Sequence, residues 1–186
     1  MVVAIKKKKK HTREQWLQKS LDVISGQGFG RIVIDNIVKS IKVTKGSFYW
    51  HFKDRNDFLE HLVTYWDENF TRNVMQHIAA MQGDAGKRLL ELMMYVTRKR
   101  LARYDAAILS LAHNEPHVSN QIAVVFESRI EFVASLIAEM GYKGLDLELR
   151  SRMIVTFMSQ EQNVLSQKAV KEQVSLIKKA YDLLVC

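Results

Sequence analysis

The fold is decided by the stretch TKGSFYWHFKDR, residues 44–55, which combines a helix start with two contrasting faces. Thr44 is a residue type that favours the N-cap position of a helix. Phe48 and Phe52 stand four residues apart, so they share one side of a helix and predict its buried side. The residues around them are basic (Lys45, Lys53), small (Gly46, Ser47) or aromatic (Tyr49). They predict an exposed face that can donate hydrogen bonds.

Two shorter helices are predicted before this stretch. Thr12 and Gln15 have the spacing of a capping box, which indicates where the first helix begins. The inward positions are Leu17, Leu21 and Ile24 in the first helix, and Ile34, Ile37, Val38 and Ile41 in the second. Three short helices, with only a brief turn between the second and third, have the layout of a helix-turn-helix. In that motif the third helix enters the major groove of DNA.

The rest of the chain also reads as helical. An apolar stripe from Phe58 to Met81 predicts a long helix that leaves the N-terminal region. Further helices follow, including one that is expected to extend to about Arg103 and a last one at about 171–185. We therefore predict an all-α protein of about nine helices. Its parts are a basic tail (1–11), a three-helix DNA-binding domain (12–56) and a helical body (57–186).

The distribution of charge favours a polyanionic partner for the N-terminal region. Residues 1–55 contain 13 lysine and arginine residues but four acidic ones, for a charge of +9, whereas the remainder sums to −1. Lys6 to Lys10 contribute five of these charges and are expected to be disordered. The only cysteine, Cys186, allows no internal disulfide, and we find neither a secretory signal nor a membrane-spanning run, so a cytoplasmic location is expected.

Residues 44–55 closely resemble the recognition-helix signature of the tetracycline-repressor (TetR) family, and the resemblance extends over roughly 12–63. It implies double-stranded operator DNA as a partner. Phe48 and Phe52 match buried positions of the family. The resemblance implies that the following residues meet bases or phosphates: Thr44, Lys45, Gly46, Ser47, Tyr49, Trp50, His51, Lys53 and Arg55.

The sequence departs from the family pattern at two places. The family usually has a small residue and then glycine in the turn, where this chain has Ile41 and Lys42. An unfavourable backbone position there would cost up to about 1 kcal/mol. The family also usually caps the second helix with serine or threonine, whereas this chain has Ile32 and Val33.

For the body, the resemblance implies a small-molecule effector bound between helices and a homodimer formed by the last two long helices, here about 147–166 and 171–185. The implied regulator is most often a repressor, released from a near-palindromic operator when the effector binds. The pocket candidates are Trp66, Phe70, Met93, Met94, Tyr95 and Phe126, although such residues are more often plain core. The interface candidates are Phe157, Val164, Val174, Ile177, Tyr181 and Leu184.

Other functions remain open at this stage. His113, Glu115 and His117 are interrupted by Pro116, so we expect no metal site and no cofactor. An enzyme is disfavoured because no catalytic constellation is visible in the sequence. A membrane-surface protein held by its lysine tail is the other alternative, because polylysine is attracted to anionic lipid. Deletion of residues 1–10 should release such a protein from lipid entirely, but should leave the operator preference of a DNA-binding dimer intact.

Overall fold

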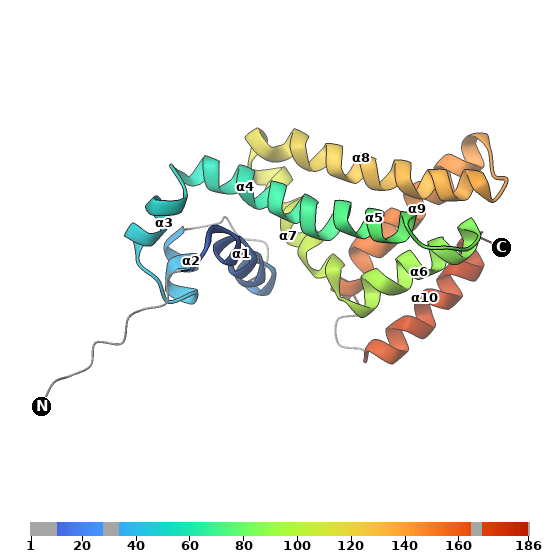
Figure 1. The fold of residues 1–186 in the computed structure, drawn as a ribbon, viewed down its shortest axis with the longest axis horizontal. Helices are drawn as coiled ribbons and strands as arrows, with labels where there is room; N and C mark the ends of the chain where they lie inside the picture. The colour runs from blue at the N-terminus through green and yellow to red at the C-terminus, as the bar shows by residue number, and fades with distance from the viewer. Residues whose placement is uncertain (1–10, 28–33, 165–168, 186) are drawn as a thin grey trace, which may run out of the picture.

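A computed structural model describes residues 11–27, 34–164 and 169–185. Within these ranges the chain is all-helical, as the sequence predicted (Figure 1). No helix in these ranges is both long and apolar enough to cross a membrane. The lysine tail, Ile32, Val33 and Cys186 lie outside the described residues. The helices are α1 (Arg13–Gln27), α2 (Ile34–Ser40), α3 (Lys45–His51), α4 (Arg55–Asp67), α5 (Asn73–Ala79), α6 (Ala85–Arg98), α7 (Asp105–Asn114), α8 (Pro116–Glu139), α9 (Gly144–Val164) and α10 (Val170–Val185), with a π-helical turn (Glu68–Arg72) and a 3₁₀ turn (Leu101–Tyr104).

The predicted helix starts in the N-terminal region are confirmed. Thr12 and Gln15 form the reciprocal capping box, with N–H to side-chain oxygen distances of 3.1 and 3.2 Å. The Thr44 hydroxyl caps α3 by accepting from the Ser47 N–H at 3.2 Å. These side chains satisfy backbone donors that would otherwise lack an intrahelical partner. The start and direction of α3 are therefore fixed locally.

The turn between α2 and α3 places a non-glycine residue in the left-handed region. Lys42 has φ of 57°, and the Val43 N–H donates to the Val38 carbonyl at 3.0 Å to close the end of α2. This is the position where the family pattern has glycine. The unfavourable backbone expected from the sequence is therefore present at Lys42.

Lys42→Gly is expected to raise the free energy of unfolding by about 0.5–1 kcal/mol, because glycine adopts this conformation without a Cβ clash. The measurement is urea denaturation followed by circular dichroism. Lys42→Ala is the matched control, since it removes the same charge but keeps the Cβ, and it should give no comparable gain. Equal stability of the two variants would show that the turn is not strained.

One rod connects the N-terminal helices to the body, but it is not a regular α-helix throughout. The helix predicted from Phe58 to Met81 is observed as α4, the π-helical turn and α5, which follow one another without a break (Figure 1). A π-helical turn accommodates one extra residue and shifts the following side chains around the axis. As a result Thr71, which is only 2% exposed, points inward, while Phe70 is half-buried.

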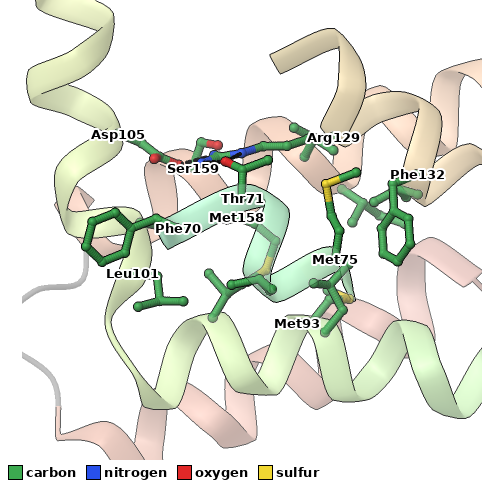
Figure 2. Close-up of a pocket in the computed structure, with 17 residues that line it drawn as sticks. Phe70, Thr71, Met75, Met93, Leu101, Asp105, Arg129, Phe132, Met158 and Ser159 are labelled. Carbon is green, nitrogen blue, oxygen red and sulfur yellow. Dashed lines mark hydrogen bonds and ion pairs between the residues drawn. The ribbon is translucent and has the colours of Figure 1, made fainter. Parts of the chain in front are cut away.

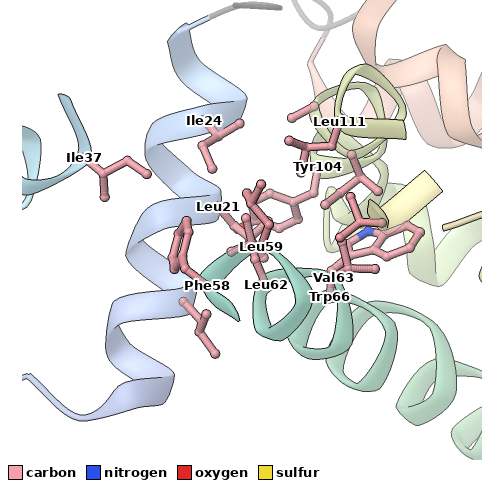
Figure 3. Close-up of a cluster of buried hydrophobic side chains, with 14 of the residues drawn as sticks. Leu21, Ile24, Ile37, Phe58, Leu59, Leu62, Val63, Trp66, Tyr104 and Leu111 are labelled. Carbon is pink, nitrogen blue, oxygen red and sulfur yellow. The ribbon is translucent and has the colours of Figure 1, made fainter. Parts of the chain in front are cut away.

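The core runs from the DNA-binding helices into the body. One hydrophobic cluster contains Leu21 of α1, Ile37 of α2, Phe58 of α4 and Leu111 of α7, and Figure 3 shows α4 side chains filling the space between α1 and α7. A second cluster joins α6, α8, α9 and α10. Because the first cluster crosses the expected domain boundary near residue 56, movement of the body can be transmitted to the N-terminal helices by packing alone.

The end of α6 differs from the prediction. We expected a helix as far as about Arg103, but α6 ends at Arg98, and Arg100 has φ of 52°. The 3₁₀ turn that follows buries Ala102 and Tyr104. The run of basic residues from Arg98 to Arg103 gave no signal for this reversal, since it contains neither glycine nor proline.

Candidate nucleic-acid interface and ligand pocket

Helix α3 has one buried and one exposed face. Phe48 and Phe52 are each 1% exposed, and Trp16 of α1 contacts both rings edge-on, with centroid distances of 5.9 and 6.3 Å. On the opposite face, Tyr49 is 62% exposed and Trp50 is 75% exposed. Large aromatic side chains are seldom left this exposed without a partner surface. The face opposite Phe48 is therefore a candidate interface.

The remaining residues predicted to contact DNA lie on or beside this face, with one exception. Gly46 is exposed, and a Cβ there would approach only the Thr44 side chain, at 3.9 Å, so other molecules can come close to the backbone. Thr44, Lys45 and Lys53 are exposed, and Ser47 and His51 are half-buried. These placements fit base and phosphate contacts.

Lys45 has an intramolecular competitor for phosphate. Its Nζ lies 2.8 Å from Asp35 Oδ1 of α2, and this hydrogen-bonded ion pair raises the pKa of Lys45. Both side chains are well exposed, at 63% and 46%, so solvent screens the pair and it adds little to stability. The carboxylate nevertheless places a negative charge beside the exposed face of α3.

Asp35→Asn is expected to lower the dissociation constant for duplex DNA about two- to fivefold, because a carboxylate that repels phosphate is removed and Lys45 is released. Fluorescence-anisotropy titrations at several salt concentrations would measure this. Glu131→Gln, which changes an exposed carboxylate of α8, should leave the affinity unchanged. Weaker binding by Asp35→Asn would indicate that the pair instead orients Lys45 for its contact.

Arg55 is the exception among the residues predicted to contact DNA. Both of its terminal nitrogens bond Glu115, one at 2.8 Å, and the two side chains are only 24% and 11% exposed. The hydrogen bonds from Arg55 to Glu115 raise the pKa of Arg55. This pair ties the first residue of α4 to the junction of α7 and α8. In the sequence Glu115 stands beside His113 and His117, and no local pattern relates it to Arg55, which lies 60 positions earlier in the chain.

The body contains a cavity of about 70 Å³ between the helical rod, α6, α8 and α9. Two of the six pocket candidates, Phe70 and Met93, line it. The lining is mostly apolar and includes Met75 and Met158, neither of which was among the six candidates. Figure 2 shows the lining side chains converging from these helices.

Polar groups gather at one end of this cavity (Figure 2). Arg129 of α8 donates to Asp105 Oδ2 at 2.7 Å and, through two nitrogens, to the Thr71 hydroxyl at 2.9 and 2.8 Å. Trp66 donates its indole N–H to the other oxygen of Asp105 at 3.1 Å. The π-helical turn is what brings Thr71 into this network. No pattern in the sequence indicated that these four side chains would be partners.

The other four pocket candidates lie elsewhere. Trp66 is fully buried with Phe126 beside it, their ring centroids 5.7 Å apart, and the Arg129 guanidinium lies over both rings. Met94 is half-buried against the second core cluster. Tyr95 contacts His77 at a centroid distance of 5.1 Å. Trp66 and Phe126 therefore support the polar end of the cavity from behind.

The interface candidates are mostly turned toward the protomer's own core. Ile177 is completely buried, and Phe157, Tyr181 and Leu184 pack half-buried against the same cluster. Val174 is half-buried, and the side chain of Val164 lies outside the described residues. Among the described side chains of these two helices, the exposed large apolar residues are instead Leu145, Leu149 and Met153 of α9 and Val170 and Leu183 of α10. Apolar residues on a helix have the same spacing whether they face a partner subunit or the protomer's own core, so the sequence does not distinguish the two cases.

Metal ligands are not clustered in the described ranges, where no three histidine, cysteine, aspartate or glutamate side chains lie close enough to hold an ion. Glu115, which the sequence places near two histidines, is occupied by Arg55.

Comparison with known proteins finds a family model that matches the N-terminal helices in sequence. Residues 17–62, which include α2, α3 and most of α1, match the family model described as bacterial regulatory proteins, tetR family. Over 149 residues the chain is 24% identical to the HTH-type transcriptional regulator AcrR of Shigella flexneri, a match that covers 80% of this chain and 63% of that relative. The chain thus spans less than two thirds of AcrR.

Solved structures share the whole fold. The TetR family transcriptional regulator PfmR of Thermus thermophilus matches 91% of this chain and 96% of its own, with a TM-score of 0.73 at 10% identity. The transcriptional regulator FadR of Bacillus subtilis, solved in complex with stearoyl-CoA, matches 94% and 98%, with a TM-score of 0.62 at 20% identity. The N-terminal helices of this chain therefore match the tetR family of bacterial regulatory proteins in sequence, and the chain shares its fold with solved regulators of that family.

Proposed function

We propose that this chain is a transcriptional regulator that binds a near-palindromic operator as a homodimer. It acts as a repressor, and binding of an effector releases it from the operator. The observation that carries the proposal is the exposed face of α3, where Tyr49 and Trp50 stand out from a fully packed aromatic base. Such a face supplies the base and phosphate contacts of a recognition helix. A regulator of this kind acts in the cytoplasm, where its DNA lies.

The test is selection of bound sequences from a random duplex pool with the full chain. We expect two inverted half-sites about one or more helical turns apart, because a twofold dimer presents its recognition helices to successive major grooves. A direct repeat, a single half-site or no enrichment over the starting pool would contradict the proposal.

The dimer interface that we propose is centred on the N-terminal half of α9. Leu145, Leu149 and Met153 are 79%, 55% and 46% exposed and stand four residues apart, so they form one stripe on α9. Arg150 donates to the Leu184 carbonyl at 2.5 Å, which places the end of α10 and exposed Leu183 next to this part of α9. A second copy packed on this stripe would cover apolar surface that otherwise remains in water.

Leu149→Glu is expected to raise the dissociation constant of the dimer by about 100-fold or more, because both copies lose a buried leucine and gain a charge at the interface. Sedimentation velocity at several concentrations would measure this. Val124→Glu is the matched control, since Val124 is 60% exposed on α8, and the dimer should persist. Dissociation by Val124→Glu alone would move the interface to α8.

The proposed response to an effector runs from the cavity to α1. Phe70 lines the cavity, and the centroid of its ring lies 4.7 Å from the centroid of the Tyr104 ring. The Tyr104 hydroxyl donates to Asp22 of α1 at 2.7 Å and accepts from Gln18 at 3.0 Å. Burial raises the pKa of Tyr104, so this donor keeps its proton at neutral pH.

A ligand that displaces Phe70 therefore moves a side chain that holds α1, and the whole N-terminal region with it. A difference in affinity of about 3 kcal/mol between the two conformations would change operator binding about 150-fold.

A further inference from the structure

We propose that the effector is a neutral, largely apolar compound with a carbonyl oxygen, and that this oxygen binds at the Thr71 and Arg129 end of the cavity. The inference rests on the proposed function and deepens it by naming the chemical class of the ligand. Four polar side chains line the cavity, Thr71, Asp105, Arg129 and Ser159, and Figure 2 shows them at the same end. A ligand there has one polar position and otherwise apolar surroundings.

The charges at this end already balance. The Arg129 to Asp105 ion pair has a distance of 2.7 Å, and the two side chains are 16% and 3% exposed. Both carboxylate oxygens accept hydrogen bonds, one from Arg129 and one from Trp66. A charged ligand would have to leave water for an apolar cavity without gaining an unmatched opposite charge, which is costly. The pair therefore selects against both carboxylate and ammonium groups.

The hydrogen-bonding groups at this end favour an acceptor on the ligand. Thr71 Oγ1 accepts from both Nε and a terminal nitrogen of Arg129, so its own proton is directed away from the guanidinium. Arg129 carries five N–H donors and has no acceptor of its own. With donors in excess and the Asp105 oxygens engaged, a carbonyl oxygen complements this end better than a donor does.

The remaining lining suits an apolar chain of adjustable shape. Met75, Met93 and Met158 contribute flexible side chains that can repack around different ligands. The cavity of about 70 Å³ is smaller than the roughly 300–1,000 Å³ of typical ligand sites. Binding must therefore widen the cavity, and Phe70, which contacts Tyr104, lies in its wall.

Three probes of equal chain length test the ligand class: 2-nonanone, nonanoate and nonylammonium, each titrated into the full chain without DNA. Trp66 contacts Arg129, so tryptophan fluorescence reports binding, and calorimetry gives the affinity. We expect 2-nonanone to bind at least about tenfold more tightly than either charged probe. Equal or tighter binding of nonanoate or nonylammonium overturns the inference, as does the absence of binding by all three.

Variants locate the carbonyl oxygen. Thr71→Val should weaken 2-nonanone binding by up to about tenfold, because the hydroxyl donor is lost. Thr71→Ser keeps a hydroxyl and should bind like the parent. The matched control is Thr97→Val, which alters a buried threonine of α6 that is not part of the lining and bonds the Met93 carbonyl. Unchanged affinity in a folded Thr71→Val variant places the carbonyl elsewhere and overturns the assignment.

Failure of this inference and failure of the proposed function give different results. The probe titrations contain no DNA, and the operator selection contains no probe. Preferential ketone binding without operator enrichment would reject the regulator and leave the ligand class standing. Operator enrichment with preferential nonanoate binding would reject only the ligand class.

Discussion

Tyr49→Ala and Lys45→Ala are each expected to lower the affinity of the dimer for its selected operator by about 30- to 1,000-fold. Each half-site loses one contact worth about 1–2 kcal/mol, and a twofold dimer loses two of them. Both side chains are exposed, and the Tyr49 ring rests edge-on against Phe48, with a centroid distance of 5.2 Å that holds its hydroxyl outward. Fluorescence anisotropy with the labelled operator would measure the loss.

Folding and dimerisation should be unchanged in both variants, because neither residue contributes to the core. Thermal melts and sedimentation velocity check this. Gln76→Ala, on an exposed position of α5 remote from α3, is the control and should bind like the parent. If either α3 variant binds the operator as tightly as the parent, α3 is not the recognition helix.

Asp105→Ala is expected to reduce the free energy of unfolding by about 3–5 kcal/mol, because it leaves the Arg129 charge buried without its partner. Asp105 is only 3% exposed and also accepts the Trp66 indole N–H, so a second buried donor loses its acceptor. Urea denaturation monitored by fluorescence and circular dichroism would measure the change.

Two further variants separate charge from hydrogen bonding at this site. Asp105→Asn keeps one acceptor and should lose less stability than Asp105→Ala. Asp146→Ala removes an exposed partner of Arg150 on α9 and should change stability by less than about 1 kcal/mol. A similarly small effect of Asp105→Ala would show that water reaches Arg129 and that the polar end of the cavity is not dry.

The N-terminal region could be predicted from the sequence because its determinants are local. Caps such as Thr12 and Thr44 act over three residues, and the four-residue spacing of Phe48 and Phe52 defines one helix face directly. The strained turn at Lys42 was also visible, because a backbone that favours glycine carried a side chain. The placement of nucleic-acid contacts on α3 stays a prediction.

The cavity and its network could not be predicted, because they depend on partners far apart in the sequence. Arg129 meets Thr71 from 58 positions away, and the π-helical turn that aims Thr71 inward leaves no apolar periodicity of its own. For the same reason the ion pair of Arg55 could not be predicted, because its partner Glu115 lies at the junction of α7 and α8. In α10, an apolar seam indicated packing, but it could not distinguish the protomer's own core from a second copy.

The π-helical turn has a consequence for how the rod tolerates changes in length. Its extra residue means that a single deletion within 68–72 would restore ordinary helical winding, with the residues on either side keeping their neighbours. A deletion elsewhere in α4 or α5 would rotate every later side chain of the rod by about 100° around the helix axis. The apolar side chains beyond the deletion would then no longer face the core. Natural relatives with a shorter rod should therefore lack a residue at this point, and with it the inward-facing hydroxyl.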